Sequence, residues 1–246
     1  MRALLALTLT LLCSPTWADS YEALYQAAGW PQQEVHFQQA LKATREGYRS
    51  HLPQAVYDSL QHNAERRLGS VQIRQRMLNQ LRQQLSSPTE ALQFFSGPVG
   101  QRVVAQEIHA SSPSELKRAQ TGMPAMPASP VRQALVERLG GVLPVREAGA
   151  EVALALGSLA ADSLSQMLPG LFDPAQTQNL VQTQRAALQR QMAGDLHNTL
   201  LYVYRELEDA ELAAFAEFAE SPAGRQYYAA ALSSLKAGLA VGQTLP

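Results

Sequence analysis

Hydrophobic side chains recur at the spacing of a helix along most of the chain. Phe37, Leu41, Thr44 and Tyr48 follow one another at intervals of four, three and four residues, which places them on one helix face. The same period returns in a later polar segment, at Val181, Leu188, Met192, Leu196, Thr199 and Val203. No stretch alternates apolar and polar residues for long enough to indicate a strand. The pattern predicts an all-α fold.

Proline and glycine divide this pattern into separate helices. Proline suits the first turn of a helix, and glycine suits its end. We expect a short helix that stops at Gly29, helices that open at Pro31 and Pro53, and a break at Gly69. Further starts are indicated by a capping box at Ser87-Pro88-Thr89-Glu90, by Asp173-Pro174, and by Asp209 as a cap.

A short motif of the form F-x-x-x-P-x-G occurs twice in the chain. The proline begins a helix, the aromatic residue lies near the end of the preceding helix, and the glycine removes a side chain where the two helices meet. The motif therefore predicts a tight corner between two helices at both places. One constant shift matches Phe94 with Phe218, Pro98 with Pro222, and Gly100 with Gly224.

This repetition predicts two tandem, pseudo-repeated helical bundles. We place the first unit at 19–110 and the second at 131–246. The intervening segment 111–130 is rich in Pro, Ser and Met, which predicts a linker with room for one short helical turn. The second copy is the longer one, and the apolar segment 147–168 can hold its extra residues. We expect this segment to form a buried helix, or to face a ligand or partner.

Residues 1–18 have the pattern of a secretory signal peptide. One positive charge precedes a short apolar run over 3–12, and 16–18 form a small-x-small cleavage site. The run is too short to cross a bilayer, so we expect a periplasmic mature chain that begins at Asp19 and has no transmembrane segment. Cys13, the single cysteine, lies inside the signal. The residue before it is leucine, which argues against a lipoprotein, and the mature chain must be stable without disulfides.

The leader, the short leucine-rich helix that ends at glycine, the long amphipathic helix and the repeated corner resemble a bacterial family of secreted all-helical proteins, the domain of unknown function twenty fifty-nine. The resemblance implies a helical fold and export, and it implies no catalytic or binding residue and no cofactor. The first copy departs from the pattern at Gly97, where the second has Ser221. The matching residues are Phe218, Pro222 and Gly224, and less clearly Phe94, Pro98 and Gly100.

Candidate chemistry is sparse. With no cysteine outside the signal, a thiolate zinc site is excluded. Asp58, His62 and Glu65 lie at i, i+4 and i+7 on one helix face, which is the most metal-like set, although a solvated surface has the same pattern. Ser221 and Gly224 could form an anion-binding helix N-terminus, or serve the corner alone. The chain has neither a G-x-S-x-G motif nor a glycine-rich phosphate loop.

Charged residues are distributed unevenly although the formal net charge is only −1. An exported, nearly neutral chain does not suggest binding to nucleic acid. The segment Glu206 to Glu220 is acidic. Basic residues gather earlier, at Arg66, Arg67, Arg74, Arg76 and Arg82. Either these two stretches are solvated faces that could pair across the repeat, or the arginine face binds an anionic lipid surface or an acidic partner.

The sequence thus favours a non-enzymatic envelope protein that binds another protein or an apolar ligand in a groove between its two units. The repetition, the amphipathic helices and the sparse chemistry support this hypothesis. The competing hypothesis is an envelope hydrolase, assisted by a metal at Asp58, His62 and Glu65. A structural spacer is a third hypothesis that no residue distinguishes.

Overall fold

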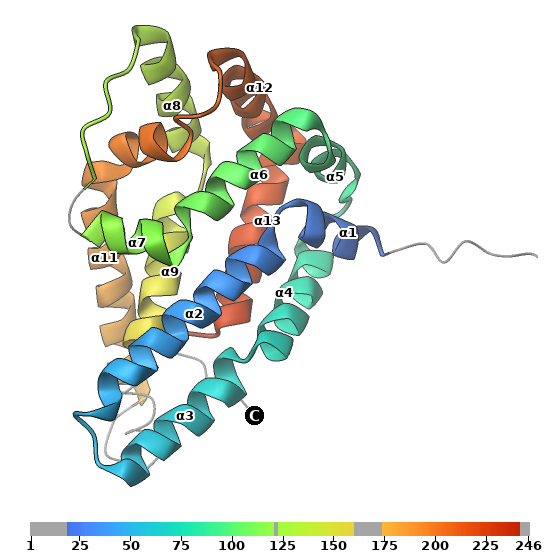
Figure 1. Ribbon diagram of the computed structural model, residues 1–246. Helices are drawn as coiled ribbons and strands as arrows, with labels where there is room; N and C mark the ends of the chain where they lie inside the picture. The colour runs from blue at the N-terminus through green and yellow to red at the C-terminus, as the bar shows by residue number, and fades with distance from the viewer. Residues whose placement is uncertain (1–18, 121–122, 160–173, 242–246) are drawn as a thin grey trace, which may run out of the picture.

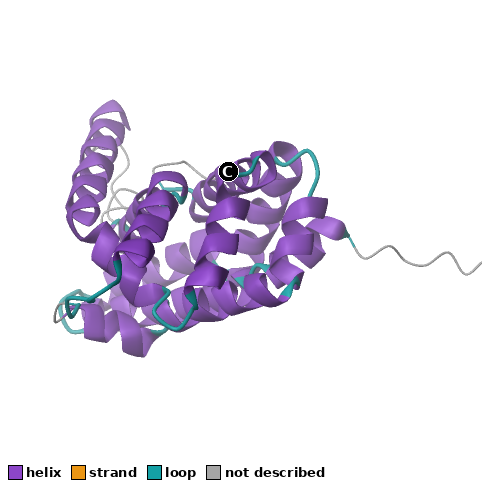
Figure 2. Cartoon of the chain, turned by 90° about the horizontal axis from the view of Figure 1, so that it is seen from above, coloured by secondary structure: helices purple, strands orange, loops and turns teal. Residues whose placement is uncertain are grey.

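The computed structural model describes residues 19–120, 123–159 and 174–241, and in this part of the chain the regular structure is α-helical without strands (Figure 1, Figure 2). The all-α prediction is confirmed for these residues. The predicted signal peptide, Cys13 and the end of the apolar segment, 160–168, lie outside them. The helices are α1 (Ser20–Ala27), α2 (Trp30–Arg49), α3 (Gln54–Leu68), α4 (Ser70–Gln84), α5 (Thr89–Ser96), α6 (Pro98–Ala110), α7 (Pro113–Gln120), α8 (Pro130–Val142), α9 (Val145–Gly157), α11 (Pro174–Val203), α12 (Asp209–Glu220) and α13 (Pro222–Leu239).

Local sequence explains most helix ends. Asp19 caps α1, because its Oδ1 accepts a hydrogen bond of 3.0 Å from the Tyr21 amide. Gly29 ends that helix with a φ of 75°, which a side chain rarely tolerates. Extended backbone at Gly69, with a ψ of 145°, separates α3 from α4. The predicted stop at Gly29 and break at Gly69 are therefore confirmed, and α7 is the short helix expected in the linker.

The predicted capping box before α5 is wrong. The helix begins at Thr89, and Pro88 precedes it in a helical backbone conformation without a side-chain cap. Ser87 lies one residue too far back, and its Oγ is 3.4 Å from the Thr89 amide nitrogen. Proline occupies the capping position itself here, so the serine cannot complete the box.

The acidic start of α12 also differs from the prediction. Glu208, and not Asp209, is the N-cap residue. The Glu211 carboxylate accepts a hydrogen bond of 2.9 Å from the Glu208 amide, as in a capping box. Asp209 is the first helical residue and accepts a hydrogen bond of 2.7 Å from Arg132.

Both halves of the sequence contribute to the hydrophobic core. One cluster contains Tyr25 and Leu68 together with Leu154 and Leu239. A second cluster combines early residues with Tyr227 from α13. The third cluster is drawn mainly from α8, α11 and α12, and it includes Val103 from α6. The apolar segment at α9 is buried as expected, at Ala150, Leu154 and Ala155.

The last helix links these clusters. Figure 1 shows α13 running through the middle of the molecule, with α4 on one side and α9 on the other, and α13 contacts both helices as well as α5. Arg76 of α4 binds the end of α13, since its guanidinium donates to the carbonyl oxygens of Ala237 at 3.1 Å and Gly238 at 2.6 Å. These bonds satisfy carbonyls that a helix end leaves without partners. Helix α13 therefore belongs to the packing of both halves.

One ion pair is buried between α9 and α11. Arg185 Nε lies 2.6 Å from Glu151 Oε1, and Nη2 lies 3.0 Å from Oε2. The Glu151 side chain is only 1% exposed. A buried carboxylate is tolerated when it is paired in this two-bond geometry. The pair orients α11 against α9.

Candidate functional site

The two sequence corners have the same local geometry. Gly97 and Ser221 are extended, with ψ values of 165° and 158°, and each precedes a helix that begins with proline. A methyl group on Gly100 would lie 2.1 Å from the Phe94 carbonyl oxygen. On Gly224, it would lie 1.9 Å from the equivalent oxygen of the preceding helix. As expected from the sequence, both glycines permit close backbone approach.

The corners also contact each other. The rings of Phe94 and Phe218 stack with centroids 3.9 Å apart and planes 6° apart. Phe215 and Phe95 add further ring contacts to this pair. The phenylalanines of the two motifs thus lie together in the core, and their role is structural.

The cap of α13 uses the groups that the anion-binding interpretation requires. The Ser221 hydroxyl accepts a hydrogen bond of 3.0 Å from the Gly224 amide and donates one of 2.7 Å to the Phe218 carbonyl. These two bonds satisfy the hydroxyl within the corner itself. The geometry favours the structural interpretation of Ser221 and Gly224.

Asp58, His62 and Glu65 are exposed on α3. Asp58 accepts a hydrogen bond of 2.7 Å from Gln54, and Glu65 lies 3.7 Å from Arg45. Within the described residues, no group of three His, Cys, Asp or Glu side chains is placed to hold a metal ion. The structure therefore adds no geometric support to a site at these three residues.

Most of the predicted arginine face has partners inside the molecule. Arg74 pairs with Glu22, Arg82 pairs with Asp19, and Arg76 binds the end of α13. Arg67 donates to the Ser158 hydroxyl at 3.0 Å. These contacts tie α4 to α1 and to α13, and they tie α3 to the end of α9. They give the arginines a structural role that does not require an external anion.

The acidic stretch is paired with other cations. Three ion pairs connect it to α6 and α8: Arg102 with Glu211 at 2.9 Å, Arg132 with Asp209 at 2.7 Å, and Arg138 with Glu220 at 2.7 Å. The Arg138 pair lowers the pKa of Glu220, because the guanidinium donates hydrogen bonds to its carboxylate. The stretch is thus part of the packing around α12.

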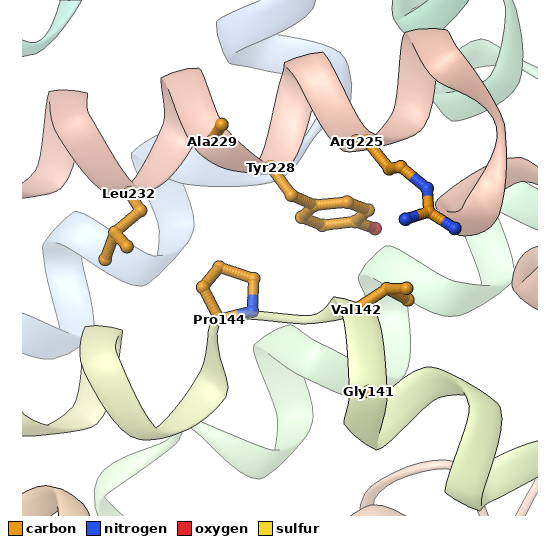
Figure 3. Close-up of a pocket in the computed structure, with 7 residues that line it drawn as sticks. All are labelled: Gly141, Val142, Pro144, Arg225, Tyr228, Ala229 and Leu232. Atoms are coloured by element: carbon orange, nitrogen blue, oxygen red, sulfur yellow. The ribbon is translucent and has the colours of Figure 1, made fainter.

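A surface pocket lies beside α13, where this helix faces the turn between α8 and α9 (Figure 3). Its volume is about 240 Å³. Arg225 and Tyr228 extend from α13 across the pocket, opposite Val142 and Pro144 (Figure 3). The other lining residues are Gly141, Ala229 and Leu232. All seven residues belong to the second sequence unit, so this pocket is not the groove that was expected between the units.

Two polar side chains in this pocket have unused hydrogen-bonding capacity. The Tyr228 hydroxyl is buried and has no hydrogen-bond partner among the described residues. Arg225 donates from Nε to the Glu220 carbonyl oxygen at 2.8 Å, and its terminal nitrogens have no bonded partner in the part of the chain described. In Figure 3 the hydroxyl points toward the guanidinium end of the pocket. This end is polar, while the opposite wall is apolar.

A titratable carboxyl group, that of Glu107, lies near Tyr204 and Tyr228. Glu107 of α6 accepts a hydrogen bond of 2.8 Å from the Tyr204 hydroxyl. Burial raises the pKa of Glu107 to about 7. Burial is also the main reason that the pKa of Tyr228 is raised well above its ordinary value, and the charge of Glu107 adds to the effect. Burial therefore favours the protonated, neutral forms of the Glu107 carboxyl and the Tyr228 hydroxyl.

A second polar cluster joins α7 to the end of α11. The Tyr202 hydroxyl donates to Glu115 at 2.6 Å, and Arg118 donates to the same carboxylate at 2.7 Å. The hydrogen bond from Tyr202 is the main cause that lowers the pKa of Glu115. The cavity beside them, lined also by Met123, measures only about 10 Å³. This volume is too small for an organic ligand, so the cluster serves to attach α7.

Sequence reasoning missed Arg225 and Tyr228. A signal was present in the repeat, because the same shift that matches the corners places Gln101 opposite Arg225 and Val104 opposite Tyr228. The corner residues agree between the copies, whereas these two positions change in charge and size. The difference between the two copies at these equivalent positions was the signal that could have indicated Arg225 and Tyr228.

No family model, curated protein or solved structure matches this chain. The resemblance to the secreted helical family consequently stays a prediction. Across the described residues, no helix combines the length and apolar character needed to cross a membrane.

Proposed function

We propose that this protein is an exported, non-enzymatic binding protein of the cell envelope, located in the periplasm. It holds a small ligand in the pocket between α13 and the turn that joins α8 to α9. The observation that carries the proposal is the composition of this pocket: an apolar wall faces the Arg225 guanidinium, whose terminal nitrogens have spare hydrogen-bonding capacity, and Tyr228 lies beside it. Ligand sites typically combine a mainly apolar lining with a few placed polar groups.

The pocket favours binding over hydrolysis. Acyl or phosphoryl transfer needs a nucleophile beside a general base, or a metal. The described lining consists of Gly, Val, Pro, Arg, Tyr, Ala and Leu, so it offers no carboxylate, imidazole, thiol or serine hydroxyl. Arg225 and Tyr228 can hold a ligand, but they do not form such a pair.

The first helix supports the export part of the proposal. Asp19, the residue that would follow signal cleavage, caps α1 and pairs with Arg82 of α4. Cleavage after Ala18 would leave these contacts intact. The mature chain would then begin directly with a packed helix, and the resemblance to the secreted helical family points the same way.

The arrangement of helices supports a relation between the two units. Helix α1 contacts α5, and α8 makes the corresponding contact with α12. Each helix that follows a corner also reaches the other unit, since α6 contacts α12 and α13 contacts α5. We propose that the chain consists of two related helical units that exchange these helices. In this view, the pocket residues are a specialisation of the second unit.

The proposed function is tested by blocking the pocket. Ala229 is exposed and lines the pocket, so Ala229→Phe fills the space without removing an interaction. Ala105 is the exposed equivalent on α6, and Ala105→Phe is the matched control. Native mass spectrometry of protein purified from its own envelope should detect a bound small molecule in the wild type and in the control, and lose it in Ala229→Phe.

Two outcomes contradict the proposed function. One is a wild-type protein that is free of any ligand under these conditions. The other is a ligand that Ala229→Phe retains to the same extent as the control, because it would then bind elsewhere. Thermal unfolding of both variants verifies that they are folded.

A further inference from the structure

We infer that the pocket beside α13 selects a small organic anion: a carboxylate attached to a compact apolar body. The carboxylate lies at Arg225, and the body lies along Val142, Pro144 and Leu232. This inference rests on the proposed function and specifies the chemical class of its ligand.

The charge of the pocket favours an anion. Arg225 is the only charged residue among its described lining residues. The hydrogen bond of 2.8 Å from Arg225 Nε to the Glu220 carbonyl oxygen fixes the side chain and leaves the two terminal nitrogens for a ligand. A guanidinium held in this way presents parallel donors that match the two oxygens of a carboxylate.

The neighbouring carboxylate of Glu220 does not by itself neutralise the positive charge of Arg225. The Glu220 carboxylate binds Arg138 through two hydrogen bonds, of 3.0 Å and 2.7 Å. Glu217 adds an electrostatic attraction to Arg138, the residue that donates both of these hydrogen bonds. The carboxylate of Glu220 is thus hydrogen-bonded to Arg138, while Arg225 is hydrogen-bonded to the Glu220 backbone and attracts its carboxylate only through charge.

The size and wall of the pocket define the rest of the ligand. A volume of about 240 Å³ is below the roughly 300 to 1,000 Å³ that is usual for drug-sized ligands. It suits one ring or a short chain. Pro144 and Leu232 line the end away from the guanidinium, and Val142 lies across from it (Figure 3). An inorganic anion would leave this apolar wall uncovered.

The first copy shows that the corner itself does not need an arginine. Gln101 is equivalent to Arg225, and its Nε2 donates to the Ser96 carbonyl oxygen at 3.0 Å. The hydrogen bond from Arg225 to Glu220 is the same interaction one unit later. Glutamine therefore meets the structural requirement, and the guanidinium adds a positive charge that the corner does not use.

This comparison supplies the test. Arg225→Gln should keep the backbone bond and remove the charge. Binding of benzoate, benzamide, benzyl alcohol and inorganic phosphate is measured by isothermal titration calorimetry on the mature protein. We expect benzoate to bind at least about tenfold more tightly than the two neutral probes and phosphate. Arg225→Gln should remove this preference for benzoate, and Ala229→Phe should block all the organic probes.

The outcomes separate the two proposals. Benzamide or benzyl alcohol binding as well as benzoate would overturn the anion class and leave the binding function intact. Equal affinity for phosphate would overturn the apolar body. Benzoate affinity that is unchanged in Arg225→Gln, while the variant keeps the wild-type melting temperature, would overturn the role of Arg225. Absence of binding for every probe would contradict both proposals.

Discussion

At the scale of single residues, the ionisation of Glu107 should affect stability near neutral pH. Burial raises its pKa from 4.5 to about 7. In the unfolded chain the carboxyl is charged above about pH 4.5, whereas in the folded protein it keeps its proton up to about pH 7. The folded state therefore binds more protons in this interval. Stability from this group is present at low pH and is lost as the pH rises toward 7.

Glu107→Gln tests this dependence, because an amide oxygen can still accept the hydrogen bond from Tyr204 without taking a charge. Relative to the variant, the wild type should lose up to about 3 kcal/mol of unfolding free energy between about pH 5 and pH 8. Urea unfolding across this range measures the difference. A constant difference between the two proteins at all pH values would show that Glu107 ionises normally in the folded state.

The residues of the candidate site illustrate what a single sequence cannot provide. Arg225 and Tyr228 are three positions apart on a helix, a spacing that also describes any helix face. They line a common pocket only because the turn at Val142 and Pro144 lies opposite them. Asp58, His62 and Glu65 had an equally good spacing, and among the described residues no other element brings further metal ligands to them. Spacing within one helix cannot distinguish these cases.

At the scale of elements, the corner glycines should be among the least replaceable residues. Gly224→Ala would place a methyl group 1.9 Å from a carbonyl oxygen of the preceding helix. The two helices would have to separate, so we expect a loss of several kcal/mol, on the order of 3 or more. Gly194→Ala on α11 is the matched control, since its methyl group would meet no side chain and no other helix within 4 Å among the described residues.

The control should change stability in the opposite direction. Alanine favours a helix interior over glycine by up to about 1 kcal/mol, so Gly194→Ala should raise the melting temperature. Thermal unfolding followed by circular dichroism measures both variants. If Gly224→Ala were as stable as the wild type, the close approach of α12 and α13 would not be needed at the corner.

Most elements could be predicted because their signals are local. Gly29, Gly69, Pro98 and Pro222 act within a few residues of their positions, and each marks a helix end in the structure. The error at Pro88 has the same local character. A proline fits both the first turn and the position before it, and here it takes the earlier one.

At the scale of the whole molecule, the sequence predicted the helices but not their partners. The expected division placed α4 in one unit and α13 in the other. In the structure these two helices pack along each other, and Arg76 of α4 binds the end of α13. Amphipathic periodicity defines which face of a helix is buried, but it does not specify which helix covers that face. The core that the two halves of the sequence share could therefore be recognised only from the structure.

A core shared in this way should unfold as one unit. Leu212 of α12 is fully buried in the cluster drawn mainly from α8, α11 and α12, and Leu212→Ala should cost roughly 2 to 5 kcal/mol. Trp30 packs against the other two clusters, and it is the only tryptophan of a chain that begins at Asp19. Phe94 and Tyr228 pack against the cluster that contains Leu212 and also against a cluster that Trp30 contacts. The destabilisation caused by Leu212→Ala should therefore also be detected at Trp30.

In urea, the transitions followed by Trp30 fluorescence and by far-ultraviolet circular dichroism should coincide, and Leu212→Ala should shift both to lower concentration by the same amount. Leu68→Ala, at a fully buried position in the first half, provides the reciprocal test. Suppose instead that Trp30 keeps its wild-type midpoint while part of the helical signal is lost early. The two halves would then fold independently, and the contact between α4 and α13 would not couple them.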